Sequence, residues 1–151
     1  MSALGRLAEL GLTLPAVVPP VAAYVPAVRT GNLVYTSGQL PMVAGAVALT
    51  GKVGAEVSPE QARDLARTCA LNALAAIDAL VGLDAVVRVV KVVGFVASVP
   101  GFTGQPGVVN GASELLGEVF GEAGRHARSA VGVVSLPLDA PVEVELIVEV
   151  G

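Results

Sequence analysis

The chain has 151 residues, a net charge of −4, and 54% hydrophobic against only 15% charged residues. The length suits one domain with a sizeable core, but an ordinary soluble domain carries roughly 25% charged residues. The acidic balance, and the lack of a basic cluster beyond Arg125 and Arg128, argue against a nucleic-acid partner, which would need a basic face.

The first 28 residues predict a short helix followed by an extended segment. The helix is expected from Ser2 to Leu10 and ends at Gly11. The uncharged stretch from Leu10 to Val28 contains four prolines, which exclude a membrane-spanning helix and predict extended or edge structure from Pro15 to Pro26. No signal peptide is recognisable, so we expect a cytoplasmic protein without a membrane partner.

A hairpin is expected next. Two short apolar runs, Val21–Val28 and Leu33–Ser37, flank an Arg-Thr-Gly-Asn sequence that is typical of a turn. The following residues, 38–54, are expected to form a loop with a weak strand near Val47.

A long helix is predicted from its capping residues. Ser58 can cap the first turn, Pro59 fits the first helical position, and Gln61 completes a capping box. Apolar residues then recur at helical spacing from Ala62 to Leu80, and a glycine at position 82 provides the stop.

The second half of the chain predicts a strand, a helix and two further strands. β-Branched residues indicate a long strand over Val86–Val99, and a helix is expected over Gln105–Phe120. Two strands then close the chain, Ala127–Leu136 and Val142–Val150, on either side of a turn at Leu138–Pro141. Valine or leucine alternates with mostly glutamate in the last strand, so its even-numbered side chains share one face.

These elements predict an α+β fold of order ββαβαββ, in which two helices cover one face of a sheet. The other face still carries valines of the long strand, so its burial requires a partner and we expect a homo-oligomer. Cys69 is the only cysteine, which leaves no cysteine-based metal site. We expect Cys69 to be a buried, inert thiol, and we expect neither a metal nor an organic cofactor.

Arg128 and Glu143 are the strongest candidates for chemistry. If their strands pair as a hairpin centred near Leu136, Arg128 comes close to Glu143 or Glu145. A guanidinium matches both oxygens of a carboxylate ligand, and a carboxylate beside it can orient water or take a proton. The alternative is a cross-strand salt bridge on a solvated face. His126, the only histidine, is expected to be structural or at the surface.

Two segments of the chain form a pair of motifs. The opening motif is Gly31-Asn32-Leu33-Val34-Tyr35-Thr36-Ser37-Gly38-Gln39-Leu40-Pro41, and the closing motif comprises residues 126–131, Leu136-Pro137 and Val142-Glu143-Val144-Glu145. Together they resemble the signature motifs of the RidA (YjgF) family. The resemblance covers residues 20–151 and leaves 1–20 as an N-terminal extension of a single domain, 1–151. It implies a chorismate-mutase-like fold and a homotrimer whose sheets line a central β-barrel.

The resemblance also implies active sites between neighbouring subunits. Arg128 matches the arginine that grips the substrate carboxylate, and Glu143 matches the glutamate that orients water. The substrate-binding residues that the resemblance implies are Tyr24, Ser37, Gly38, Asn110 and Ala130. The implied ligand is a small-molecule carboxylate, and Tyr24 and Arg128 are expected to come from different chains.

Three functions remain open from the sequence. The first is an enzyme that hydrolyses reactive 2-imino or 2-enamine acids to 2-keto acids and ammonia. The second is a non-catalytic module that binds small carboxylates, and it is favoured by Ala130 and Gly132, where the family has a cysteine and a glutamate. The third is ribonuclease activity, against which the acidic charge and the missing basic stripe count.

Overall fold

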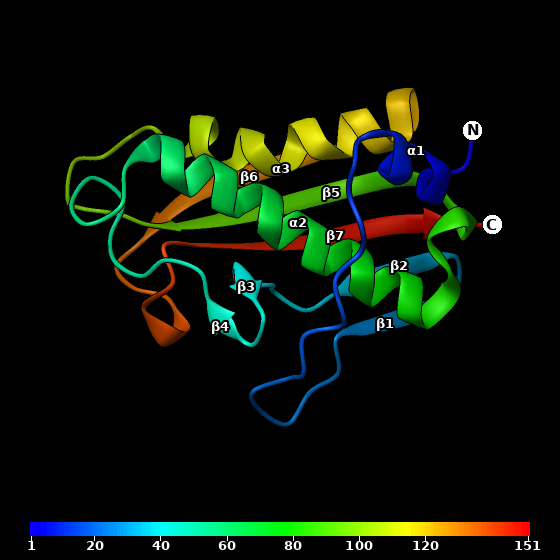
Figure 1. The fold of residues 1–151 in the computed structure, drawn as a ribbon, viewed down its shortest axis with the longest axis horizontal. Helices are drawn as coiled ribbons and strands as arrows, with labels where there is room; N and C mark the ends of the chain where they lie inside the picture. Colours follow the sequence, from blue (N-terminus) through cyan, green and yellow to red (C-terminus); the bar gives the residue numbers. More distant parts are fainter.

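A five-stranded sheet with strand order β1-β2-β7-β5-β6 lies at the centre of the computed structural model, which describes residues 1–151 (Figure 1). Neighbouring strands are antiparallel, except that β5 and β6 run parallel. Helices α2 and α3 cover one face of the sheet (Figure 1). The elements are α1 (Ala3–Glu9), β1 (Ala27–Thr30), β2 (Leu33–Thr36), β3 (Met42–Val43), β4 (Ala46–Val47), α2 (Pro59–Val81), β5 (Val86–Ala97), α3 (Gln105–Phe120), β6 (Ala127–Val133) and β7 (Val142–Val150).

The strongest local signals of the sequence are confirmed. The Ser58 hydroxyl accepts a hydrogen bond from the Gln61 backbone at 3.1 Å, and the Gln61 side chain accepts one from the Ser58 backbone at 2.9 Å, so the predicted capping box starts α2. Gly82 ends the helix with φ at +82°, a conformation that favours glycine. The first predicted strand is too long, because the proline-rich segment offers few backbone donors and only Ala27–Thr30 pairs.

The core lies between the sheet and the two long helices. The even-numbered side chains of β7 are at most 1% exposed, whereas its odd-numbered side chains are half-buried. The buried row forms one hydrophobic cluster with residues of α2 and α3, among them Leu74, Cys69 and Leu116. Each fully buried leucine contributes about 1.5–3 kcal/mol to stability. The N-terminal helix belongs to the same unit, because Leu7 lies in this cluster.

One prediction about the sheet is wrong, and it concerns β6 and β7. These strands do not form a hairpin, because β5 lies between them and pairs with both. Helix α3 returns the chain to the start of β5, so β6 runs parallel to β5 in a β-α-β unit. The expected proximity of Arg128 and Glu143 depends on the hairpin and fails with it.

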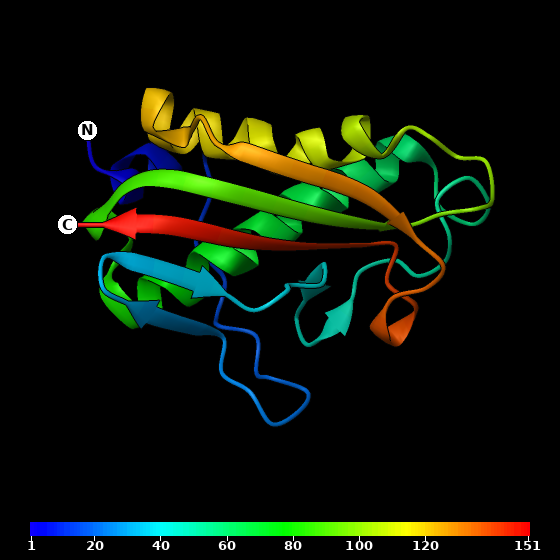
Figure 2. The same cartoon turned by 180° about the vertical axis from the view of Figure 1, so that it is seen from behind.

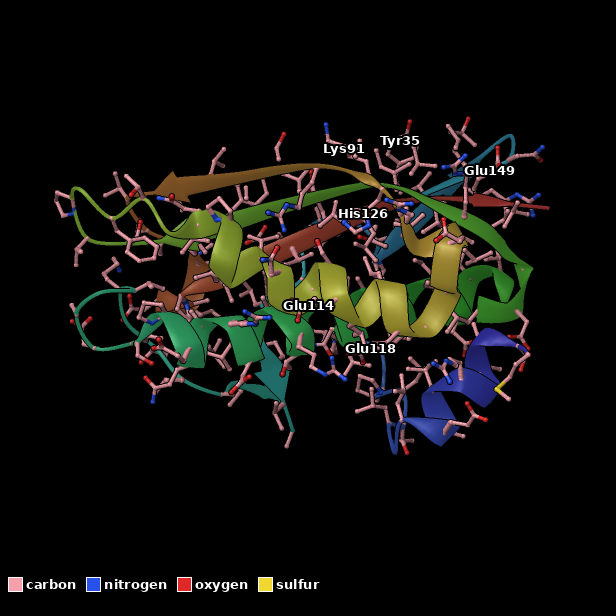
Figure 3. The ribbon with its side chains drawn as sticks, turned by 90° about the horizontal axis from the view of Figure 1, so that it is seen from above. Tyr35, Lys91, Glu114, Glu118, His126 and Glu149 are labelled. Atoms are coloured by element: carbon pink, nitrogen blue, oxygen red, sulfur yellow. The ribbon has the colours of Figure 1, made fainter.

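The sheet face away from α2 and α3, called the open face below, has no helix over it (Figure 2), and it carries exposed apolar side chains. Val28, Tyr35 and Val131 are 53%, 43% and 43% exposed. Figure 3 shows Tyr35 and Lys91 on this side of the sheet, away from α3. A sheet face that carries several exposed apolar side chains is a candidate interaction surface. No helix combines the length and the apolarity that spanning a bilayer requires.

Gly111 allows α3 to pack closely against α2. A Cβ atom at this position would lie 2.9 Å from the carbonyl carbon of Arg63 on α2, and nearer still to its oxygen. Backbone atoms cannot move aside without shifting a helix, so Gly111→Ala is expected to cost about 2–3 kcal/mol of unfolding free energy. Chemical denaturation of the variant measures this loss.

Gly117→Ala in the same helix is the matched control for that substitution. Gly117 is exposed, and nothing lies within 4 Å of a Cβ atom placed on it. Alanine should therefore raise stability by roughly 0.5–1 kcal/mol through helix propensity alone. If the two substitutions had equal effects on the free energy of unfolding, the close contact between α2 and α3 would not be what makes Gly111 necessary for stability.

Candidate active site

Glu143 lines a hollow of about 370 Å³ at the start of β7. Its walls come from the proline-rich segment, the residues after β2 and the turn before β7. The lining residues are Val21, Tyr24, Ser37, Gly38, Leu40, Pro137 and Glu143. Four of the residues predicted from the sequence, Tyr24, Ser37, Gly38 and Glu143, therefore lie in one place.

Backbone pairing brings Gly38 beside Glu143. Gln39 and Val144 exchange N–H···O bonds of 2.8 and 3.0 Å, which continues the pairing of β2 with β7 past the end of β2. A Cβ atom on Gly38 would lie 2.8 Å from the carboxyl carbon of Glu143. A side chain at position 38 would therefore displace the Glu143 carboxyl group from its place.

Ser37 ties the proline-rich segment to the sheet. Its hydroxyl donates to the Val25 carbonyl at 2.6 Å, and its backbone N–H donates to the Pro26 carbonyl at 2.8 Å. Tyr24 stands just before this anchor and is 44% exposed. The Tyr24 hydroxyl accepts a long hydrogen bond of 3.4 Å from the Val21 backbone. Ser37 therefore contributes by holding the segment that carries Tyr24.

The surroundings of Glu143 raise the pKa of its carboxyl group above the ordinary value. Burial is the larger cause, because it disfavours the charged form, and the charge of Glu145 on the same face is the second. None of the salt bridges of the chain involves Glu143. A pKa shifted towards neutral pH suits a group that accepts a proton and returns it.

Arg128 lies elsewhere, on the helix-covered side of the edge strand β6. Its Nη1 donates to Asn110 Oδ1 at 2.8 Å and to Ser113 Oγ at 3.2 Å, and its Nη2 donates to the Pro106 carbonyl at 3.3 Å. All three acceptors belong to α3 and none of them is charged. The guanidinium is therefore held in place by neutral groups.

No carboxylate compensates the charge of Arg128. Its guanidinium forms no salt bridge, and its Nε–H has no acceptor within the chain, so the predicted alternative of a cross-strand ion pair is not realised. The edge formed by Nε and Nη2 can donate two parallel hydrogen bonds to a carboxylate. A half-buried cation without a counter-ion is costly, which makes Arg128 a strong candidate to receive an anionic ligand.

Within one chain, Arg128 and Glu143 lie on opposite faces of the sheet. Arg128 pairs with Val92 in β5, whereas Glu143 pairs with Phe95 in the same strand. Paired residues share a face and successive residues alternate, so an offset of three residues places the two side chains on different faces. Two strand spacings and three residues along the strand separate their Cα atoms by about 14 Å.

The predicted site is thus divided into two halves, each built by different elements. The Glu143 half-site comprises Tyr24, Ser37, Gly38 and Glu143, and the Arg128 half-site comprises Asn110, Ser113, Arg128 and Ala130. One small ligand cannot contact both halves of a single chain.

The sequence-based prediction missed Ser113 and assigned no chemistry to His126. The Ser113 hydroxyl bonds to Arg128 and also lies 2.9 Å from His126 Nε2. Figure 3 shows His126 between the sheet and α3. Helical spacing is the signal that could have found Ser113, because it lies one turn after Asn110 on the same helix face.

Two small residues, Ala130 and Gly132, follow Arg128 on the same face of β6. Ala130 is small and packs against the core. A Cβ atom on Gly132 would lie 2.8 Å from Nε2 of Gln105, whose side chain donates to the Phe102 carbonyl at 2.8 Å. No group of three or more His, Cys, Asp or Glu side chains is arranged to hold a metal ion.

Comparison with known sequences relates the chain to one family. The family described as Endoribonuclease L-PSP matches residues 15–150. A protein named TCP17 from Trypanosoma cruzi is 46% identical over 148 residues, which is 97% of this chain and 92% of that protein.

Solved structures share the fold. The protein Atu1372 from Agrobacterium tumefaciens, of unknown function, is 51% identical with a TM-score of 0.91, over 99% of this chain and 92% of that chain. A Shewanella oneidensis protein named as a candidate endoribonuclease is 31% identical with a TM-score of 0.95, over 99% and 100% of the two chains. The YjgF gene product of E. coli is 28% identical with a TM-score of 0.63, over 91% and 94%.

Proposed function

The chain belongs to the Endoribonuclease L-PSP family, to which the YjgF proteins also belong, and we propose that it hydrolyses reactive 2-imino or 2-enamine acids to 2-keto acids and ammonia. The reaction takes place between two copies of the chain, where the Glu143 half-site of one faces the Arg128 half-site of its neighbour. The observation that carries the proposal is this division. A guanidinium whose Nε–H has no acceptor within the chain lies on one face, and a half-buried carboxyl group in a hollow lies on the other.

Arg128 binds the carboxylate of the substrate through its Nε and Nη2 donors. Asn110 and Ser113 occupy the other end of the guanidinium, so the substrate approaches in one orientation. Fixing the imine carbon in this way lowers the barrier by several kcal/mol, because positioning replaces a random encounter with water.

Glu143 handles the protons of the reaction. It holds a water molecule, whose oxygen bonds to the carbon of the protonated imine while a water proton passes to Glu143 and the C=N electron pair moves onto nitrogen. Glu143 then returns the proton to that nitrogen. The C–N bond breaks, ammonia leaves with its electron pair, and the remaining hydroxyl group loses its proton to give the 2-keto acid.

The assembly that joins the two half-sites is a homotrimer. The open face carries apolar side chains on β1, β2 and β6, and their burial between copies removes them from water. Sedimentation at micromolar concentration is expected to give roughly three times the chain mass of 15.0 kDa. A stable monomer would leave the half-sites apart and contradict the proposal.

Mixed assemblies test the shared site directly. Arg128→Ala and Glu143→Gln should each be inactive alone, since each removes one half of every site. Co-refolded in equal amounts, they should recover about a quarter of the wild-type sites, because random mixing in a closed ring gives that fraction two intact halves. Release of 2-keto acid from an imine generated by a dehydratase provides the assay.

The matched control for this experiment is a mixture of Glu143→Gln with Glu143→Ala. Both variants damage the same half-site, so their mixture should stay inactive. If the first mixture also stayed inactive while both variants formed mixed trimers, the site would not be shared between chains.

The same preparations separate the competing functions. A binding module would take up a 2-keto acid without accelerating imine hydrolysis. A ribonuclease would cleave RNA, the activity for which the family and the Shewanella relative are named, although the net charge of −4 weighs against a polyanionic substrate. Wild-type protein that leaves the imine lifetime unchanged would refute the proposed hydrolysis.

A further inference from the structure

A chain of hydrogen bonds links Arg128 to His126 through Ser113. Arg128 Nη1 donates to Ser113 Oγ at 3.2 Å, Ser113 Oγ lies 2.9 Å from His126 Nε2, and His126 Nδ1 lies 2.6 Å from the Gly124 carbonyl oxygen. All of these groups except the Gly124 carbonyl are side chains without a charged partner in the chain.

The direction of each hydrogen bond follows from the last one. A carbonyl oxygen only accepts, so His126 Nδ1 carries the proton that it shares with Gly124. In the neutral ring Nε2 is then an acceptor, and the Ser113 hydroxyl donates a hydrogen bond to Nε2. With its proton committed to His126, the Ser113 oxygen presents its lone pairs to Arg128.

Without His126, the Ser113 hydroxyl would be free to turn. A serine inside a helix readily donates to a backbone carbonyl of the preceding turn, and its oxygen would then face Arg128 less well. Asn110 alone would remain to fix the Nη1 end of the guanidinium. The side chain of Arg128 would lose one of the contacts that aim its Nε–Nη2 edge outward.

We propose that Ser113 and His126 are positioning residues, which set the orientation of the Arg128 guanidinium so that its Nε–Nη2 edge receives the ligand carboxylate. This inference rests on the proposed carboxylate-binding role of Arg128. Ser113 and His126 do not touch the substrate. They act only through Arg128, and this dependence makes the inference testable.

A double-mutant cycle with pyruvate as the probe tests the dependence on Arg128. In the wild-type background, Ser113→Ala and His126→Ala are each expected to weaken pyruvate binding roughly three- to tenfold, the effect of one hydrogen bond. In an Arg128→Ala background, the same substitutions should change the residual affinity little. Ser113→Thr keeps the hydroxyl group and should restore wild-type affinity.

Thr68→Ala is the control for loss of a helical hydroxyl group. Thr68 bonds only to the Asp64 carbonyl of its own helix, so its removal should leave pyruvate affinity unchanged. If the losses caused by Ser113→Ala and His126→Ala persisted in full in the Arg128→Ala background, the two residues would act independently of Arg128 and the inference would be wrong.

Nuclear magnetic resonance of the ligand-free trimer separates this inference from the proposed function. The Nη1 protons of Arg128 should exchange slowly with solvent in the wild type and at least several-fold faster in Ser113→Ala and His126→Ala. Unchanged exchange would overturn the positioning role whether or not pyruvate binds. Failure of the wild type to bind pyruvate, with slow exchange intact, would instead refute the proposed function alone.

Discussion

Replacing Arg128 with lysine is expected to weaken the binding of a small 2-keto acid by about 1.5–3 kcal/mol, the range for a hydrogen bond to a charged group. This corresponds to roughly 10- to 150-fold in Kd. Lysine keeps the charge, but it lacks the Nε–Nη2 edge that can bind both carboxylate oxygens. Calorimetric titration of the wild type and Arg128→Lys with pyruvate measures the difference.

The same substitution also tests how much Arg128 contributes to the stability of the fold. Its hydrogen bonds to Asn110, Ser113 and Pro106 connect β6 to α3, so their partial loss should lower Tm by about 2–4 °C. Arg67→Lys is the matched control, because Arg67 forms a 3.0 Å salt bridge with Glu118 away from both half-sites. It should leave pyruvate affinity unchanged. Full affinity in Arg128→Lys, together with a lowered Tm, would make Arg128 a structural residue.

Local sequence signals predicted most elements of the fold. The capping residues at Ser58 and the glycine at 82 define α2, and the alternation of valine and glutamate defines the buried and open sides of β7. Such signals depend on neighbours in the chain, so a single sequence carries them. Strands β3 and β4 have two residues each, which is too short to give such a pattern, and the sequence predicted only a weak strand near Val47.

The order of strands in the sheet could not be predicted in the same way. Consecutive strands often pair, which favours a hairpin of β6 and β7, but the crossover through α3 places β5 between them. The strand order matters because it decides whether the candidate residues can act together within one chain. A hairpin would bring Arg128 and Glu143 together in one chain, whereas the observed order places them on opposite faces.

The two half-sites have one physical feature in common, which is that each keeps a polar group in an unfavourable state. Arg128 has no counter-ion, and the charged form of Glu143 is disfavoured by burial and by Glu145. Uncompensated groups of this kind lower stability and cluster at functional sites. Five salt bridges elsewhere in the chain show that acidic partners are available in the sequence, yet none lies beside Arg128.

Glu143→Gln is expected to lower kcat for imine hydrolysis by roughly 10²–10⁴-fold, the usual contribution of a general acid–base group. Glutamine fills the same space beside Gly38 but cannot accept a proton. Binding of pyruvate should change little, because in the proposed shared site the carboxylate is held by Arg128 of the other chain. Glu145→Gln is the control, since it removes a neighbouring carboxylate and leaves Glu143 in place. A variant Glu143→Gln with wild-type kcat would exclude Glu143 from the chemistry.

The raised pKa of Glu143 predicts opposite effects of pH on activity and on stability. In the proposed mechanism the ionised form of Glu143 accepts the proton from water, so kcat/KM should fall as pH drops through this pKa, above the ordinary value of 4.5. Glu145→Gln removes one cause of the shift and should move this acid limb to lower pH.

For stability, the folded chain binds the Glu143 proton more tightly than the unfolded chain. The stabilising contribution is therefore complete below pH 4.5 and is lost as pH rises through the raised pKa. Glu143→Gln should therefore be more stable than the wild type at neutral pH, and denaturation curves should show this gain disappear in acid. If the difference in unfolding free energy between the variant and the wild type were the same at neutral and acid pH, the pKa of Glu143 would not be raised in the folded chain.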